Sequence, residues 1–478
     1  MTQMAARFKR SFSRSTANQA DWSVAVLSGP LEAARRRGAT SVVFVVDLDD
    51  FHVLNNGLGR TVGDAVLGIL ARRLERSVQT LGQFLGCVGD RFIVLVDEAN
   101  AEPPFDAIAD QLIDVVCAPM RVEAGNSPAL VVSASVGSVL DDGARVDELV
   151  RCADIALQEA KTRGLNSHVT FEPAMRDAAE AEARLDRDLR EALDTELLFL
   201  AYLPGVDIAS GRVTSAEALL RWQHPERGVI PAGEFVPLLE QSGTIVEVGS
   251  WVLREACMQA AAWQRRGISV AVHVNLSARQ LGARVLLGDL RDTLKTSRLD
   301  PAHLVLEVSE ATIAKDTVAV AERLAEFKAL GVNIAMDNFG AAYATLSQLK
   351  LLPLDIVEFD RSLVADIGRE ASATELVRTL VRIADSLGLR TLAAGVENDN
   401  QLKLLRDAGC AGALGYLYSQ PVDAGALDKL FRDSEAQAPV AWRVPQGGRV
   451  VDGDRAAEQN EVIDKDKGVD PDQAVETL

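Results

Sequence analysis

Carboxylate and amide side chains follow several short apolar segments in the second half of the sequence. These segments read "AVHVNLS", "LVLEVSE", "NIAMDNFG", "LDIVEFD" and "TLAAGVE", and their β-branched content is typical of buried strands. The oxygen-bearing side chains at these and a preceding strand end are Glu217, Asn275, Glu307, Asp337, Asp360 and Glu397. Carboxylates grouped with one amide are the donors that Mg²⁺, Mn²⁺ or Ca²⁺ prefers, although any single acid is better explained as a helix cap or a rim charge. Because the acids recur at successive strand ends, the pattern favours a divalent-cation site.

The segment "LDIVEFD" places two acids on one face of its predicted strand. Side chains alternate along a strand, so Glu358 and Asp360 point to one side and Val357 to the other. We therefore expect Glu358 to face Asp360. Repulsion between two such carboxylates raises the pKa of one of them or attracts a cation.

The order of strands and helices predicts two domains around these residues. Between residues 21 and 171 helices and strands alternate in a mixed α+β pattern. A charged, alanine-rich connector helix is expected over residues 172–193. From 194 to 434, strands alternate with helices in a way that predicts parallel βα units closed into a barrel. Residues 1–20 and 435–478 are expected to be disordered tails, basic and acidic respectively.

Composition restricts the classes of function. The 478 residues carry a net charge of -19, which opposes broad binding to DNA, and no apolar run approaches the roughly 20 residues that span a membrane. The cysteines, which form no CxxC pair, are Cys87, Cys117, Cys152, Cys257 and Cys410. Their spacing predicts free thiols in a reducing cytoplasm.

The barrel segment resembles a known family. "EALLRWQHPERGVIPAGEFVPLLEQSG", followed in order by "VNLS", "LEVSE", "DNFG", "DRS" and "GVE", is similar to the EAL domain of cyclic di-GMP phosphodiesterases. The resemblance covers about residues 192–430 and implies a modified (β/α)₈ barrel with two divalent metals, Mg²⁺ or Mn²⁺. It implies metal ligands at Glu217, Asn275, Glu307 and Asp337, and ligand-binding roles for Arg221, which matches a phosphate contact, Asp360 and Glu397. It also allows a homodimer through this domain.

Several positions depart from the EAL pattern. Asn338 stands where the second metal expects a carboxylate, and Glu358 replaces a lysine that helps to orient water. Two glutamines and a glutamate of the family are replaced by Leu203, Leu414 and Ala394. Loss of general-base assistance and of the paired-metal clamp leaves no catalytic residue that we expect to function.

The first domain resembles the GGDEF domain of diguanylate cyclases. The resemblance rests on "DLDDFHVLNNGLGRTVGDAVL", "VGDRF", "SASVGSV" and "ADIALQEAKTRGLN". It implies a metal ligand at Asp47, a guanine contact at Asn55 and a matching ligand-site position at Asp64. In the signature motif Val88 replaces a glycine and Arg91 an acid, so cyclisation of GTP is not expected. Binding of GTP without turnover and a purely structural role both remain open.

The sequence therefore predicts a GGDEF-type α+β domain followed by an EAL-type barrel, both with altered motifs. We expect an inactive or nearly inactive regulator in cyclic di-GMP signalling, which acts through weak nucleotide sensing or contacts with an unidentified protein. Two alternatives are kept: a weak cyclic di-GMP phosphodiesterase that uses the retained metal ligands, and a protein adaptor that binds no nucleotide.

Overall fold

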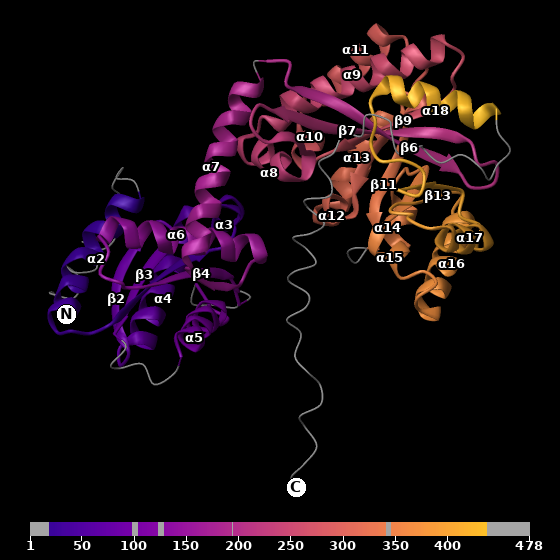
Figure 1. The fold of residues 1–478 in the computed structure, drawn as a ribbon. Coiled ribbons are helices and arrows are strands. Elements are labelled where there is room, and N and C mark those ends of the chain that lie inside the picture. The colour runs from indigo at the N-terminus through magenta and orange to yellow at the C-terminus, as the bar shows by residue number, and fades with distance from the viewer. Residues whose placement is uncertain (1–18, 98–103, 123–128, 194, 341–345, 437–478) are drawn as a thin grey trace, which may run out of the picture. The chain divides into compact units, whose positions relative to one another are not determined.

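The computed structural model describes residues 19–97, 104–122, 129–193, 195–340 and 346–436, and the chain divides into two units, Met1–Arg184 and Leu185–Leu478 (Figure 1). The tails predicted for residues 1–20 and 435–478 lie outside the described residues except at their inner ends. There residues 19–20 and 435–436 are helical, so the prediction of disorder was wrong for these four positions.

The first unit is built on a five-stranded sheet with the order β2-β3-β1-β4-β5. Its strands are β1 (Ser41–Leu48), β2 (Gly82–Val88), β3 (Arg91–Asp97), β4 (Ala134–Leu140) and β5 (His168–Thr170). Its helices are α2 (Gln19–Arg36), α3 (Phe51–Leu58), α4 (Arg60–Val78), α5 (Phe105–Cys117) and α6 (Val146–Arg163). The helix α7 (Pro173–Leu193) runs from this unit into the second.

The central strand β1 explains why its sequence is apolar without interruption. Val42, Phe44 and Val46 pack with α4 and α5, whereas Val43 and Val45 pack with α2 and α6. Both faces of β1 are therefore covered, and all eight of its residues are buried. Since the flanking strands β3 and β4 both run antiparallel to β1, the predicted α+β sheet domain is confirmed.

The second unit is a closed barrel. Its strands are β6 (Leu198–Asp207), β7 (Val213–His224), β8 (Gly228–Pro231), β9 (Ala271–Leu276), β10 (Leu304–Ser309), β11 (Asn333–Phe339), β12 (Ile356–Phe359), β13 (Arg390–Ala393) and β14 (Gly412–Leu414). The sheet order is β6-β14-β13-β12-β11-β10-β9-β7-β8, and a further pairing of β6 with β7 closes the ring. The strand β6 runs antiparallel to both of its neighbours, and β8 is appended outside the ring. This confirms the predicted modified (β/α)₈ barrel.

Helices cover the outside of the barrel. They are α8 (Ala232–Ser242), α9 (Ile245–Arg265), α10 (Ala278–Gly282), α11 (Leu286–Ser297), α12 (Glu310–Lys315), α13 (Thr317–Lys328), α14 (Leu346–Leu351), α15 (Arg361–Ala365), α16 (Ala371–Ser386), α17 (Asp399–Ala408) and α18 (Ala424–Ala436), with a 3₁₀ turn at Pro301–His303. Inside, a separate apolar layer consists of Leu203, Ala271, Val305, Ala335, Ile356, Leu392 and Leu414. Because side chains alternate, the residue two positions further along several of these strands points into the same interior. Those next positions carry the polar groups of the site.

A buried aspartate ties α18 to α9 on the barrel wall. Asp428 accepts a hydrogen bond of 2.6 Å from the indole of the fully buried Trp263 and also pairs with Arg266. We expect Asp428→Ala to lower the free energy of unfolding of the barrel by about 2 kcal/mol, because the indole N–H loses its acceptor while it stays buried. Urea unfolding followed by tryptophan fluorescence measures this. Asp428→Asn, which keeps an acceptor, should lose less than half as much, and equal losses in both variants would contradict the argument.

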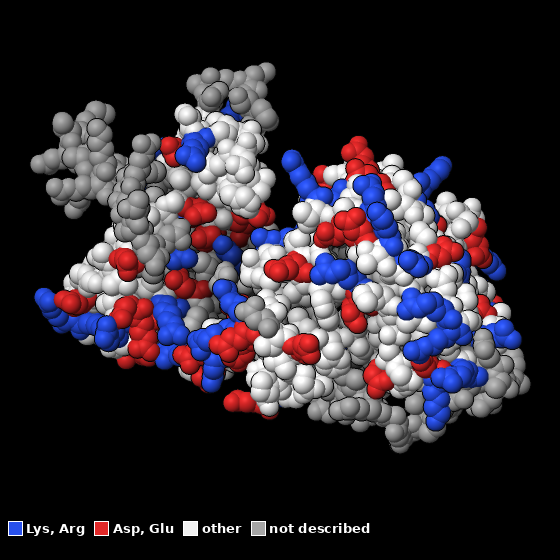
Figure 2. All heavy atoms as spheres, turned by 90° about the horizontal axis from the view of Figure 1, so that it is seen from above, with Lys and Arg blue, Asp and Glu red and all other residues white. Residues whose placement is uncertain are grey.

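All five cysteines are free, as the sequence predicted. Among the described residues, none of the helices combines the length and the apolar character that crossing a bilayer requires. Basic and acidic side chains are interspersed on the face shown in Figure 2, and neither sign forms a continuous field over its described atoms.

Candidate functional site

Strand register brings polar residues of four neighbouring strands into the barrel interior. Glu307 on β10 lies opposite Asn275 on β9, and Glu217 on β7 lies opposite His273 on β9. On the other side of β10, Ser309 is level with Asp337 of β11. The strand ends therefore bring together the four residues that the EAL resemblance named as metal ligands.

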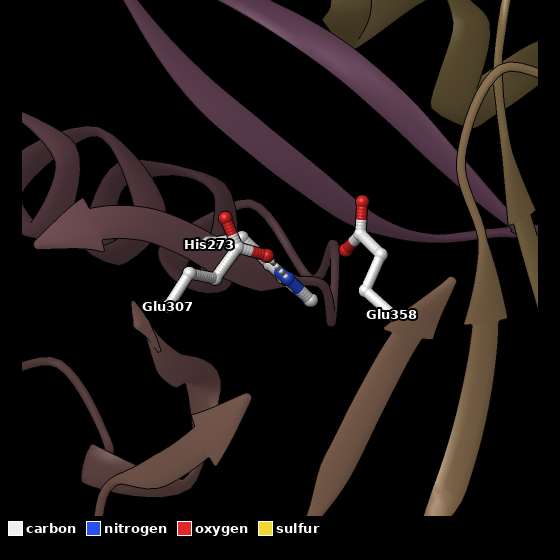
Figure 3. A group of neighbouring side chains, drawn as sticks. All are labelled: His273, Glu307 and Glu358. Atoms are coloured by element: carbon white, nitrogen blue, oxygen red, sulfur yellow. Dashed lines mark hydrogen bonds and ion pairs between the residues drawn. The ribbon is translucent and has the colours of Figure 1, made fainter. Parts of the chain in front are cut away.

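The deepest polar group in the barrel is formed by His273, Glu307 and Glu358 (Figure 3). Their exposed fractions are 2%, 1% and 4%, and one potential ligand atom from each lies within 4.8 Å of the other two. The Nδ1 of His273 and the Oε1 of Glu307 are 2.6 Å apart and share a hydrogen bond. Burial lowers the pKa of His273 to about 4, so the imidazole is neutral at physiological pH.

Glu358 lies beside Glu307 in this interior, and the described side chains that shift its pKa are carboxylates. Burial raises its pKa well above the usual value, and the carboxylates of Glu307, Asp337 and Glu217 raise it further. Among the described residues, no hydrogen-bond partner reaches its buried Oε2. Asp360, which we expected Glu358 to face, lies just after the end of β12 and caps α15 by accepting a hydrogen bond from the backbone N–H of Ser362 at 2.8 Å. Alternation ends with the strand, so Glu358 meets Glu307 instead.

Closer to solvent, the expected ligands are engaged by one another. The Asn275 amide donates to Glu217 Oε1 at 2.8 Å. Asn338 donates its backbone N–H and its side-chain amide to the two oxygens of Asp337, at 2.6 and 2.8 Å. The fourth residue, Glu307, is bonded to His273. A metal ion held by this set would have to replace these internal hydrogen bonds, and Asn338 offers an amide where a second ion expects a carboxylate.

Asn338 adopts a left-handed conformation, with φ of 57°, at an irregularity in the pairing of β11 with β12. Asparagine tolerates this conformation better than most residues do. The next residue but one, Gly340, donates its backbone N–H at 2.9 Å to Glu310, the buried last residue of the "LEVSE" segment. These contacts fix the end of β11. The alanines that complete the "DNFGAA" motif lie outside the described residues.

Arg221, which the EAL resemblance matched to a phosphate contact, is buried in this structure. It lies within β7, on the same face as Glu217, and its guanidinium is buried and donates to the carbonyl of Leu220 at 3.0 Å. Burial and Asp337 raise the pKa of Glu217, whereas Asn275 and Arg221 act to lower it. In this arrangement the positive charge of Arg221 stabilises the ionised carboxylate of Glu217.

The other expected contact positions are scattered or apolar. Glu397 is exposed in the segment after β13, where its backbone N–H bonds Gln401. Leu203 lies directly opposite Glu217 on β6, and Leu414 is fully buried in the apolar layer. Hydrocarbon thus lines part of the interior where the family carries glutamines.

In the first unit, two cations of the chain surround the expected metal ligand. Asp47, near the end of β1, pairs with Lys161 Nζ at 2.5 Å and lies 3.8 Å from Arg91. Arg91 also pairs with Asp154 at 2.8 Å. Burial raises the pKa of Asp47, and the hydrogen bond from Lys161 opposes this. The ammonium and guanidinium groups already supply the positive charge that a metal would bring.

The two residues that the GGDEF resemblance assigned to ligand binding, Asn55 and Asp64, lie on the consecutive helices α3 and α4. The side chain of Asn55 lies against Gly63, where an added Cβ would come within 1.9 Å of Asn55 Oδ1, so only glycine leaves room for it. Asp64 is exposed on the same helix, α4. Val88 is buried at the end of β2, directly opposite Arg91. The helices α3 and α4 that carry Asn55 and Asp64 are present, whereas the hairpin of β2 and β3 carries Val88 and Arg91 at the altered signature motif.

This arrangement predicts how the first unit responds to an acid at position 91. Arg91→Glu should lower the stability of the first unit by about 2 kcal/mol, because three carboxylates would then meet and, among the described residues, Lys161 would be the cation left to pair with Asp47. Hydrogen exchange of β1 amides measures the change, and Mg²⁺ should restore part of the protection. Arg91→Gln is the neutral control and should lose less. Undiminished protection in Arg91→Glu would contradict this assignment.

Sequence reasoning missed three of these residues: His273, Lys161 and Asp154. His273 carried a usable signal, since it stands two positions before Asn275 and alternation therefore places both on one face. Lys161 and Asp154 reach the site from α6, and nothing in the local pattern of that helix indicates their partners.

The fold and site define a protein of two linked domains, an α+β sheet domain and a closed barrel, each with carboxylates at strand ends. The profile of the "Diguanylate cyclase, GGDEF domain" family matches residues 25–167, and that of the "EAL domain" family matches residues 186–421. The chain belongs to the family of tandem GGDEF–EAL proteins.

Known relatives share both domains. An uncharacterized signaling protein of Caulobacter vibrioides is 36% identical over 402 residues, which are 84% of this chain and 49% of that protein. The bifunctional diguanylate cyclase/cyclic di-GMP phosphodiesterase MucR of Pseudomonas aeruginosa is 34% identical over 406 residues, 84% of this chain and 58% of MucR. This chain spans about half the length of these relatives. A solved structure described as PaMucR phosphodiesterase in a c-di-GMP complex is 38% identical, with a TM-score of 0.50, and covers 51% of this chain and 99% of its own.

Proposed function

We propose that this chain is a regulator in cyclic di-GMP signalling that turns over neither cyclic di-GMP nor GTP. The observation that carries the proposal is the buried carboxyl of Glu358 next to Glu307, with no cation among the described groups that shift its pKa. A phosphodiesterase of this family needs a cation at that position to help activate water. When ionised, a carboxyl there repels both hydroxide and an anionic phosphodiester, and when protonated it still supplies no positive charge.

The first domain supports the same conclusion through different residues. Lys161 and Arg91 neutralise Asp47 and Asp154, so a Mg²⁺ ion would have to displace two internal ion pairs before it could hold a triphosphate. Arg91 is held by these pairs at the motif hairpin, where the family carries an acid. GTP can still be bound through Asn55 without being cyclised.

Turnover assays test the proposal directly. Purified protein incubated with cyclic di-GMP and Mn²⁺ should release no linear dinucleotide above the metal-only background, and with GTP and Mg²⁺ it should form no cyclic di-GMP. Glu217→Ala and Asp47→Ala are the matched controls. Hydrolysis that disappears in Glu217→Ala would support the weak-phosphodiesterase alternative, which the retained acids of the barrel favour, and would overturn the proposal for that domain.

Binding of cyclic di-GMP is expected to be weak, in the micromolar range or poorer, and to depend on a divalent cation. Leu203 and Leu414 provide no hydrogen bonds, and each missing polar contact to the ligand costs roughly 1 kcal/mol. Isothermal titration calorimetry with and without Mg²⁺ measures the affinity. Equal affinity in both buffers would contradict the expected masking of the acids by metal.

A specific feature favours the adaptor as a second candidate. A groove of about 800 Å³ on the outside of the barrel is lined by Leu198, Leu200, Val248, Trp251 and Tyr202, with Arg254 and Glu255 also along it. Apolar side chains flanked by charges are the usual composition of a protein-binding surface. If no nucleotide binds at any concentration, this groove is where a partner of the second unit should be sought by cross-linking.

A further inference from the structure

The buried group of His273, Glu307 and Glu358 has the composition of a transition-metal site. We propose that these three residues bind one Zn²⁺ ion in the centre of the barrel. This site shares Glu307 with the ligand set implied by the family resemblance, but its other two ligands are different residues. The inference goes beyond the proposed function and does not depend on nucleotide binding.

The geometry of the three side chains supports this assignment. They come from three strands, β9, β10 and β12, and all three are at least nine-tenths buried. Among the described residues, these three side chains form a group of metal-ligand types whose ligand atoms lie within 4.8 Å of one another. Ligand atoms around a tetrahedral Zn²⁺ lie roughly 3.3 Å apart, so small side-chain rotations reach that spacing. In Figure 3 both carboxylates point toward the region of the imidazole.

An independent observation indicates that the group lacks a ligand. Glu358 Oε2 is buried and has no hydrogen-bond partner among the described atoms, and the groups that act on the charge of Glu358 are carboxylates. A buried acceptor without a partner costs about 1 to 3 kcal/mol, and more when it is charged. A cation at this position would satisfy Oε2 and remove the repulsion between Glu358 and Glu307.

The donor types select the metal. A neutral imidazole together with two carboxylates suits Zn²⁺, whereas Mg²⁺ prefers oxygen ligands and keeps several waters. The imidazole of His273 supplies the nitrogen donor, and its Nδ1 lies 2.6 Å from Glu307 Oε1. Three protein ligands leave the fourth position of a tetrahedral ion to water or another ligand.

The ion would enter from the mouth of the barrel. On the opposite side of His273, a cavity of about 110 Å³ is lined by Arg390, Asp355 and Asn333 at the amino ends of the strands. The Arg390 guanidinium opposes a cation on that side, and Asp355 is already paired with Lys328 at 2.8 Å. Toward the mouth the side chains of Asn275 and Asn338 are exposed and Asp337 is half-buried.

Metal titration of the full chain tests the proposal. Protein stripped with a chelator and titrated with ZnCl₂ by calorimetry should bind one ion in the barrel, at least 100-fold more tightly than it binds Mg²⁺. Glu358→Gln and His273→Gln should each weaken Zn²⁺ binding at least tenfold. Glu322→Gln, an exposed acid on α13 of the same barrel, should have no effect. Circular dichroism and the unfolding midpoint show whether each variant is folded.

Two outcomes would overturn the inference. One is the absence of tight Zn²⁺ binding to the unmodified chain. The other is binding that is lost in Glu217→Gln but retained in Glu358→Gln, which would place the ion among the family ligands instead. Co²⁺ provides a check that needs no variant: nitrogen-containing tetrahedral coordination should give visible absorption, whereas a spectrum typical of the hydrated octahedral ion would contradict the site. None of these measurements involves nucleotide, so they can fail while the turnover assays succeed, or the reverse.

Discussion

Replacing Glu358 with lysine should raise the free energy of unfolding of the barrel by about 3 kcal/mol in the presence of a chelator. In the unmodified chain, burial and the neighbouring carboxylates raise the pKa of this carboxyl well above its ordinary value, so keeping it in the interior costs free energy. A lysine ammonium would instead face Glu307, Asp337 and Glu217. Desolvation of the ammonium offsets part of this gain, so the net increase in the free energy of unfolding is limited to about 3 kcal/mol.

Urea unfolding followed by tryptophan fluorescence measures this change, because Trp222 and Trp263 are fully buried in the barrel. Glu358→Gln is the matched control: an amide keeps the shape and can donate to Glu307, so it should stabilise the barrel by less than half as much. A destabilised Glu358→Lys variant would show that the interior does not carry the excess negative charge inferred here. In Zn²⁺ the difference between lysine and glutamate should shrink, since the metal supplies the cation.

The architecture could be predicted because its signals are local and repeated. Strands with β-branched residues alternate with amphipathic helices along the barrel, and this order alone indicates βα units. The antiparallel direction of β6 was not predicted; the family resemblance indicated only that the barrel is modified. The strand β2 and the helix α5 went unpredicted; in β2 two glycines and a glutamine interrupt the apolar residues, and the first part of the strand is only partly buried.

The site was predictable only as far as strand alternation holds. Alternation correctly placed Glu358 in the interior, but it failed for Asp360, where the chain has already turned to cap a helix. The length of β7 was also not predictable from alternation: the strand has 12 residues and continues past Glu217 to include Arg221. Contacts that depend on packing between distant strands or helices, such as those of His273 with Glu307 and Lys161 with Asp47, have no local pattern from which to infer them.

The double variant Glu358→Lys with Asn338→Asp should hydrolyse cyclic di-GMP at least about 100-fold faster than the unmodified chain, whose rate should equal background. The lysine restores a cation that can orient water, and help of this kind is worth roughly 10² to 10⁴ in rate. The aspartate replaces an amide that now donates to Asp337 at 2.8 Å. A carboxylate cannot make that hydrogen bond, so Asp337 is freed and a second acid is added at the mouth. The freed Asp337 and the added carboxylate at position 338 both favour binding of a divalent ion at the mouth over internal hydrogen bonds.

The assay follows release of the linear dinucleotide in Mn²⁺, with each single variant measured alongside. Each single change should give less than a tenth of the activity of the pair, because the lysine and the second acid act on the same bound water and cannot replace each other. Adding Glu217→Ala to the double variant should return the rate to background, which shows that the barrel site is responsible. If the double variant is folded, binds cyclic di-GMP and still shows no cleavage, then Leu203, Leu414 and Ala394 also block the reaction. If it binds no cyclic di-GMP at all, the barrel has lost its nucleotide function and the adaptor alternative takes its place.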